Sequence, residues 1–142
     1  MSTFDGSGRP VASYPAVSGK SQSCQCSDDM NIEDYGPTPE GMYTVDPSAI
    51  NRWSFLKGLP KIGGWGSRIA WGNQRTHLVP FRHNAEGRTQ MYIHGGRYPG
   101  SKGCIDLTNS NDAFHEWLER QTRPVPVIVD YGDNNSFGLG RF

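Results

Sequence analysis

No segment of this 142-residue chain is apolar for long enough to cross a bilayer, and Met1 is not followed by the basic and then apolar stretch of a signal peptide. The chain has no excess of charge either, because it contains 14 basic and 14 acidic residues. The basic residues are dispersed, which argues against a nucleic-acid partner. We therefore expect neither membrane insertion nor nucleic-acid binding.

Cysteine is scarce, and three cysteines are too few for a disulfide scaffold. Cys24 and Cys26 are one residue apart, a spacing that pairs only in a strained ring. We expect either a free pair in a loop or a bridge formed only after oxidation, so Cys104 would remain a free thiol. The pair lacks a second matching pair, and zinc needs three or four ligands, so no metal site is expected and no cofactor is indicated. The histidines expected to be structural or exposed are His77, His83 and His115.

Helical patterning is also rare, whereas glycine and proline are abundant, at 18 and 10 residues. This composition favours short strands joined by turns, and the length suffices for one core without staples. We predict a single domain over residues 1–142 with a mainly β fold, a small sandwich or barrel-like sheet. One helix should follow Cys104. Residues 132–142, rich in Gly and Asn, should form a flexible tail.

Apolar alternation and turn residues set the expected elements. The helix should cover residues 111–121, with Asn109 or Ser110 as its cap. Its apolar stripe consists of Ala113, Phe114, Trp117 and Leu118. The expected strands cover residues 9–17 with a break at Pro15, 41–45, 67–71, 76–82, 89–94 and 125–129, with a turn at Gly72–Asn73.

Charge is distributed unevenly along the chain. Residues 51–103 hold nine bases and one acid, and this basic section leads to Cys104. A cationic approach would favour an anionic substrate and would lower the pKa of a thiol. A solvated basic face is the alternative interpretation. The bases concerned include Arg68, Arg75, Arg82, Arg88, Arg97 and Lys102.

The most informative segment sets His94 ten residues before Cys104, with glycines and Ser101 between them. Short apolar patches flank both residues, which predicts two strand ends joined by a glycine-rich loop. A cysteine attacks as its thiolate, and a nearby imidazole is the usual means of forming one. Gly103 would let backbone amides approach a reacting carbonyl and stabilise its oxyanion.

This segment resembles the signature of the YkuD-type L,D-transpeptidases, in which a His-Gly pair is followed by Ser/Thr-x-Gly-Cys and an apolar residue. The matching residues are His94-Gly95 and Ser101-Lys102-Gly103-Cys104-Ile105. Many members carry arginine two residues after the cysteine, whereas this chain has Asp106. The resemblance implies the L,D-transpeptidase fold, catalytic Cys104 and His94, and supporting roles for Gly95, Ser101 and Gly103.

Other segments are similar to the L,D-transpeptidase effectors of type VI secretion. Residues 4–8 and 12–19 look like the opening hairpin of that branch, and residues 36–45 look like its Gly-Pro-x-Pro-x-Gly-x-Tyr segment. That branch tends to lack the arginine, which fits Asp106. It implies an antibacterial toxin that is delivered by a secretion apparatus to the periplasm of target bacteria. The producer would need an immunity protein that occludes the cleft.

The implied reaction is acyl transfer at the L,D-bond of a peptidoglycan tetrapeptide stem. His94 takes the Cys104 proton, the thiolate attacks the carbonyl of the third residue, and D-alanine leaves. Water would then give L,D-carboxypeptidase activity, and a free D-amino acid would give exchange. Tyr98, Arg97 and Asp106 are candidate substrate contacts, and most tryptophans are expected in the core or lining a groove.

Three alternatives stay open at this point. A housekeeping L,D-transpeptidase would cross-link the cell's own wall. A catalytically inactive module would use the same cleft to bind the wall. A papain-like or amidase-type hydrolase is disfavoured because those families usually place the cysteine before the histidine.

Overall fold

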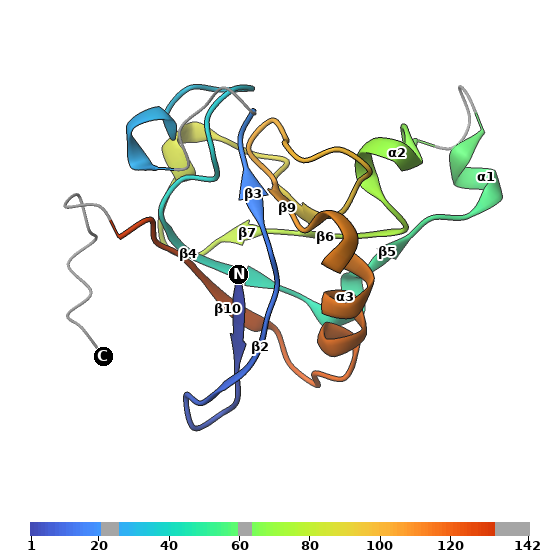
Figure 1. Cartoon of the computed structure of the whole chain (residues 1–142). Helices are drawn as coiled ribbons and strands as arrows, with labels where there is room; N and C mark the ends of the chain where they lie inside the picture. Colours follow the sequence, from blue (N-terminus) through green and yellow to red (C-terminus); the bar gives the residue numbers. More distant parts are fainter. Residues whose placement is uncertain (21–25, 60–63, 133–142) are drawn as a thin grey trace.

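The computed structural model describes residues 1–20, 26–59 and 64–132, which form short strands in three sheets and one helix of more than a single turn (Figure 1). The predicted mainly β fold with a helix after Cys104 is confirmed. The strands are β1 Ser2–Phe4, β2 Pro10–Ser13, β3 Val17–Ser18, β4 Gly41–Val45, β5 Asn51–Arg52, β6 Gln74–His77, β7 Val79–Pro80, β8 Tyr92–His94, β9 Ile105–Asp106 and β10 Val125–Val129. The helices are α1 Phe55–Gly58, α2 Arg68–Trp71 and α3 Asn111–Glu119.

The five-stranded sheet runs in the order β3-β9-β8-β6-β5. Its neighbours pair antiparallel except for β8 and β9, which are parallel, with Ile93 opposite Ile105 and His94 opposite Asp106. Only residues 95–104 connect these two parallel strands. This short connection contains the whole segment between His94 and Cys104, so the sheet itself fixes where the two residues lie.

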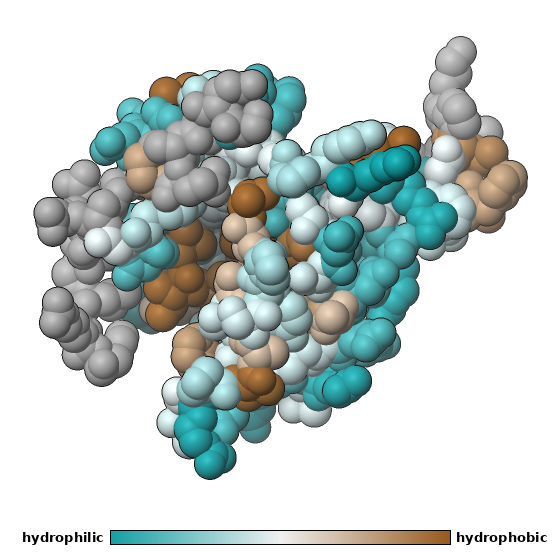
Figure 2. Space-filling model, in the orientation of Figure 1, coloured by the Kyte–Doolittle hydropathy of each residue, from teal (hydrophilic) through white to brown (hydrophobic). Residues whose placement is uncertain are grey.

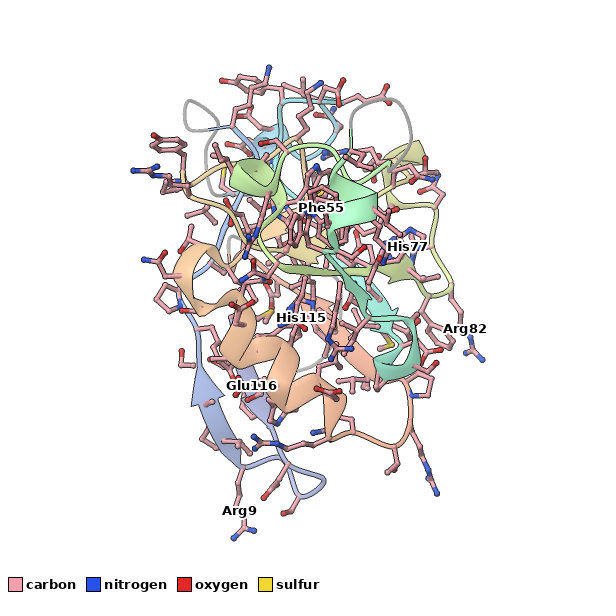
Figure 3. All side chains as sticks on the ribbon, turned by 90° about the vertical axis from the view of Figure 1, so that its right-hand side faces the viewer. Arg9, Phe55, His77, Arg82, His115 and Glu116 are labelled. Carbon is pink, nitrogen blue, oxygen red and sulfur yellow. The ribbon has the colours of Figure 1, made fainter. Side chains whose placement is uncertain are left out.

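The second sheet, β10-β4-β7, closes the other side of the core. In β4 every second residue is buried, and Tyr43 and Val45 are fully buried. Helix α3 packs Phe114 and Leu118 into the same cluster, as its apolar spacing predicts. His115 points from α3 towards the five-stranded sheet (Figure 3), where Nε2 lies 3.0 Å from the Thr76 hydroxyl.

The predicted strand over 67–71 is wrong, because residues 68–71 form the helical turn α2. The Ser67 hydroxyl accepts a hydrogen bond from the Ile69 amide at 3.2 Å, which caps the turn. Gly72 ends it with φ +68°. The Gly72–Asn73 pair therefore joins a helix to β6, and no hairpin forms there.

The predicted strand over 76–82 divides between two sheets. β6 pairs with β8 in the five-stranded sheet, and β7 pairs with β4 in the other. Leu78, which separates β6 from β7, is fully buried. Alternation in the sequence continues through this change of sheet and therefore does not reveal it.

Several boundaries also differ from the predictions. The break at Pro15 is confirmed, since β2 ends at Ser13 and β3 begins at Val17. β8 begins only at Tyr92, because Gln90 has φ +60°, which no strand residue adopts. Helix α3 ends at Glu119. Ser110 precedes it without a side-chain capping bond, and a 3-10 turn at Thr108–Ser110, which contains the other candidate Asn109, leads into the helix.

Cys26 is disulfide-bonded, so of the two alternatives the free pair is excluded for this residue. Cys104 is a free cysteine, as predicted. Cys24 and nearly all of the predicted tail lie outside the described residues. Within the described ranges, no helix is long and apolar enough to cross a membrane.

The turn α1 projects from one side of the molecule. Phe55 and Leu56 in this turn are 71% and 70% exposed, and Figure 2 shows this region as an apolar projection. Apolar residues between β4 and α2 are thus not all part of the core. Trp65, from the same section, is buried.

Candidate active site

His94 and Cys104 lie on neighbouring strands of the five-stranded sheet. His94 ends β8, and Cys104 directly precedes β9. The parallel register continues one step back to pair Cys104 with Tyr92, whose amide donates to the Cys104 sulfur at 3.3 Å. Because side chains alternate along a strand, His94 and Cys104 share one face of the sheet, and Ile93 and Ile105 share the core face.

Two clefts meet at Cys104. We call the first, of about 460 Å³, the loop-side cleft, and its lining includes His94, Ser101 and Cys104. The second, of about 440 Å³, is the strand-side cleft, and its lining includes Arg75, Tyr92 and Cys104. Trp71 lines both clefts. The histidine and the cysteine, which the sequence places at two strand ends joined by a loop, therefore line one cavity.

The His94 ring is held by the loop that follows it. Nδ1 lies 2.7 Å from the Gly95 carbonyl oxygen, which can only accept, so Nδ1 carries the proton. The Trp71 ring packs at 4.8 Å between centroids on the other side. Burial lowers the pKa of His94, opposed by the Gly95 bond, the charge of Asp106 and a backbone hydrogen bond to Ala70. The imidazole is therefore neutral at rest, and with the proton on Nδ1 the lone pair is on Nε2.

Cys104 is a buried thiol, only 7% exposed. Burial raises its pKa to about 11, although the Tyr92 amide and the charges of Arg88 and Arg75 lower it. At rest the thiol donates a long bond of 3.9 Å to the Gln90 carbonyl, and within the described part of the chain no hydrogen bond joins it to His94. Basic neighbours do lower the pKa of the thiol, as expected, but burial outweighs their charges and the net pKa is raised.

Gly95 allows the histidine strand to lie against the start of α3. A Cβ atom on Gly95 would lie 2.5 Å from the Asn111 Cβ and 2.8 Å from the Thr108 carbonyl oxygen. Any larger residue would push β8 away from the helix, and His94 would move with it. The structure thus gives Gly95 a packing role next to the histidine.

Hydroxyl groups fix the backbone on both sides of the cysteine. Ser101 Oγ donates to the Cys104 carbonyl at 2.6 Å and accepts from the Gly103 amide at 3.2 Å. Ser18 Oγ also donates to the Cys104 carbonyl, at 2.8 Å. Thr38 Oγ1 donates to the Gly103 carbonyl at 2.8 Å. Ser101 therefore orders the loop, and two residues from distant segments assist it.

Arg88 lies beneath this loop and is 5% exposed. Its guanidinium donates to the Lys102 carbonyl at 2.9 Å and to the Pro37 carbonyl at 2.5 Å. It also donates to the carbonyls of Met30 and Gly36, at 3.0 and 3.3 Å. A buried cation is thus satisfied entirely by backbone oxygens, and it ties the cysteine loop to residues 30–37.

Gly103 is needed for this arrangement. Its φ is +106°, which side-chain-bearing residues rarely adopt, and a Cβ atom there would lie 1.5 Å from Arg88 Nη2. The motif glycine before the cysteine therefore makes room for the guanidinium. Its amide already bonds the Ser101 hydroxyl.

The three candidate substrate contacts lie in different surroundings. Asp106 is fully buried, and its carboxylate accepts from the amides of Gly100 and Thr108, so it orders the loop and does not face a ligand. Tyr98 is 69% exposed, with the Arg97 guanidinium 5.8 Å from its ring centroid. Neither Tyr98 nor Arg97 lines the loop-side or the strand-side cleft.

Sequence reasoning missed the roles of Arg88, Ser18 and Thr38. One arginine among nine bases carries no signal of burial, and Ser18 and Thr38 resemble ordinary turn residues. Their roles depend on contacts across more than 50 residues, such as Thr38 with Gly103. Trp71 was expected in the core or a groove, and it lines both clefts.

The sequence model of the YkuD family, the L,D-transpeptidase catalytic domain, matches residues 1–129. No curated protein matches the chain. Among solved structures, Bdellovibrio bacteriovorus Bd1075 is 20% identical, with a TM-score of 0.49, over 86% of this chain and 38% of that one. An L,D-transpeptidase from Mycobacterium smegmatis is 20% identical, with a TM-score of 0.41, over 87% and 50%. This chain spans half or less of those two lengths, and its match to the family model over residues 1–129 shows that it belongs to the L,D-transpeptidase catalytic domain family.

Proposed function

We propose that this protein is a cysteine acyltransferase that cleaves the L,D-bond of peptidoglycan tetrapeptide stems, releasing D-alanine to water or exchanging it for a free D-amino acid. The observation that carries the proposal is that His94 and Cys104 line one cleft, with the histidine proton held on Nδ1 by Gly95. Nε2 is thereby free to take the thiol proton, as nucleophilic catalysis requires. Family membership supports a peptidoglycan substrate.

The proposed reaction has two steps, acylation of Cys104 and release of the acyl group. The Cys104 thiol passes its proton to His94 Nε2 as the sulfur attacks the carbonyl carbon of the third stem residue. The bond to the D-alanine nitrogen breaks, and the imidazolium returns the proton to that amine. A thioester remains on Cys104. Water or an incoming amine then attacks the thioester carbon and gives a proton to His94. The carbon–sulfur bond breaks, and the imidazolium returns the proton to the sulfur, which restores the Cys104 thiol.

Backbone amides beside Cys104 are the proposed oxyanion donors. The Gly103 amide bonds Ser101 Oγ at 3.2 Å, which is long for a hydrogen bond. An oxyanion is a stronger acceptor than a hydroxyl group and would compete for that amide. The contacts of Arg88 and Thr38 with the loop would keep the Gly103 amide in place as negative charge develops on the carbonyl oxygen.

Incubation with purified tetrapeptide stems, with and without a free D-amino acid, tests the reaction by mass spectrometry of the products. We expect tripeptide stems in the first case and exchanged tetrapeptides in the second. Protein alkylated at Cys104 with iodoacetamide is the control and should leave the stems intact. Cross-linked dimers as the sole product would favour a wall-building transpeptidase instead, and binding without any conversion would favour a wall-binding module.

We further propose that the enzyme acts as a type VI secretion effector in the periplasm of target bacteria. The similarity of residues 4–8, 12–19 and 36–45 to that branch supports this, and in the structure Pro37 and Thr38 hold the cysteine loop. The removal of donor stems would weaken wall growth. An immunity protein in the producer would cover the loop-side cleft, and a component of the secretion apparatus would carry the toxin.

Expression in a susceptible bacterium tests this effector role. Directed to the periplasm, the wild-type protein should lower viable counts by several orders of magnitude, whereas Cys104→Ala should not. The same wild-type protein retained in the cytoplasm is the control, because mature wall stems are outside that compartment. Equal growth of the wild-type and Cys104→Ala strains after periplasmic export would refute the toxin role and leave the enzymatic proposal intact.

A further inference from the structure

Arg75 lies beside the proposed catalytic pair. It is in β6, directly opposite His94 of β8. Paired residues of neighbouring strands share a face, so Arg75 lies on the face that carries His94 and Cys104. It lines the strand-side cleft together with Cys104 and Tyr92.

Three aromatic rings hold the Arg75 guanidinium. Its Cζ lies 4.5 Å from the ring centroids of Trp65 and Trp71 and 5.3 Å from that of Tyr92. Nη1 donates to the Trp65 carbonyl at 3.3 Å. Such stacking fixes the plane of the guanidinium while leaving its positive charge unneutralised.

No carboxylate neutralises Arg75 within the described residues, where the ion pairs are Arg9–Asp5, Arg52–Glu119 and Lys102–Asp34. Its Nε is buried and has no hydrogen-bond partner. Arg88 in the same cleft differs, because backbone carbonyls satisfy its guanidinium. Among the described residues Arg75 is thus an oriented cation beside the nucleophile that forms no ion pair. Glu33 and Asp34 line the same cleft, and Asp34 pairs with Lys102.

We propose that Arg75 binds the α-carboxylate of the amino acid on the amine side of the scissile bond, which rests on the function proposed above. The departing D-alanine and an entering amino acid form their bonds to the same carbonyl carbon and exchange a proton with the same His94. They therefore occupy the same place in turn. Their shared chemistry is an α-amino carboxylate, and a planar guanidinium suits a carboxylate.

The proposal makes Arg75 a specificity determinant for both halves of the reaction. In the first half it selects stems that end in a free carboxylate. In the second half it favours an amino acid over water, since water has no carboxylate to bind. A purely structural arginine, stacked between rings, would affect all substrates equally.

Two matched stems test the first half, one ending in D-alanine and one in D-alaninamide. Wild-type kcat/KM should be about 10- to 100-fold higher for the carboxylate, the range of a charged hydrogen bond. Arg75→Gln should lose most of that preference, and Arg75→Lys should keep part of it, because lysine keeps the charge without the fork. Arg82→Gln, at an exposed position, is the matched control and should keep the full preference.

The ratio of exchange to hydrolysis tests the second half, with a free D-amino acid, its amide and a second stem as separate acceptors. Arg75→Gln should lower this ratio for the free amino acid. Comparison of the three acceptors shows whether the site accepts the carboxylate of a free amino acid or that of a second stem. An equal rate for both stems with wild-type protein, or an unchanged preference in Arg75→Gln, would overturn the proposal. Turnover of neither stem by wild-type protein would instead refute the proposed function. If Arg75→Gln fails to fold by circular dichroism, the wild-type comparison and Arg75→Lys still decide.

Discussion

Cys104→Ala should turn over tetrapeptide stems at least about 10⁴-fold more slowly than the wild-type protein, because the proposed thioester cannot form without the sulfur. The side chain is small and buried, so the loss of one sulfur atom should leave the fold intact. Product formation by mass spectrometry measures the rate, and the urea unfolding midpoint checks the fold. Turnover within tenfold of wild type would show that Cys104 is not the nucleophile.

His94→Asn is the companion variant. The asparagine amide can donate to the Gly95 carbonyl as Nδ1 does, but it offers no base in the place of Nε2. General-base catalysis contributes about 10²- to 10⁴-fold, so we expect a rate loss in that range. A double variant with Cys104→Ala should be no slower than Cys104→Ala alone, because the two residues act as one unit.

The same pair also predicts a pH dependence. Because the pKa of Cys104 is raised to about 11, iodoacetamide labelling should increase about tenfold per pH unit from neutral pH upward. The pKa of His94 is lowered, so its neutral form persists below pH 6.5, and the acid limb of kcat/KM should lie below that value. A labelling rate that is already constant at pH 6 would indicate a resting thiolate–imidazolium pair and would contradict this prediction.

Arg88→Met should have the largest effect on stability. The substitution leaves the carbonyls of Met30, Gly36, Pro37 and Lys102 without their donor. Each buried group that loses its partner costs about 1–3 kcal/mol, so we expect a loss of about 3–5 kcal/mol in the free energy of unfolding. Urea denaturation with an unchanged m-value measures it.

Arg82→Met provides the comparison for Arg88→Met, because Arg82 is exposed and should change stability by no more than about 0.5 kcal/mol. Arg88→Lys should be intermediate, since one ammonium cannot reach all four oxygens. A loss below 1 kcal/mol for Arg88→Met would mean that water replaces the guanidinium and that the loop does not depend on it.

The parts of the fold that the sequence predicts are those with local causes. The helix after Cys104 follows from the spacing of Phe114 and Leu118, β10 follows from an apolar run, and β4 follows a Pro/Gly turn. The error at residues 67–71 arises because the Ser67 cap and Gly72 outweigh a weak strand pattern. The predicted strand over 76–82 is divided between two sheets because β6 pairs with β8 and β7 pairs with β4. Apolar alternation in the sequence does not show which strands pair.

The candidate site divides in the same way. His94, Cys104 and the glycines between them lie in one segment, so the sequence alone predicts two strand ends joined by a glycine-rich loop. The raised pKa of the Cys104 thiol arises from burial by the whole fold, and residue types nearby in the sequence suggest the opposite direction. Likewise, the exposed position of Tyr98 and the interior position of Asp106 follow from tertiary packing.

The hydroxyl and guanidinium contacts around Cys104 also bear on when the enzyme becomes competent. The cysteine loop is held by Ser18, by Thr38 and, through Arg88, by residues 30–37, all of which precede it by more than 60 residues. Contacts at such separation form late, because long stretches of chain must first close. An unfolded chain, whether it is leaving the ribosome or passing through a channel, therefore contains every residue of the motif but has no ordered nucleophile. Its reactivity should appear together with the docking of its own N-terminal third, and trimming of that third should silence a motif that remains chemically intact.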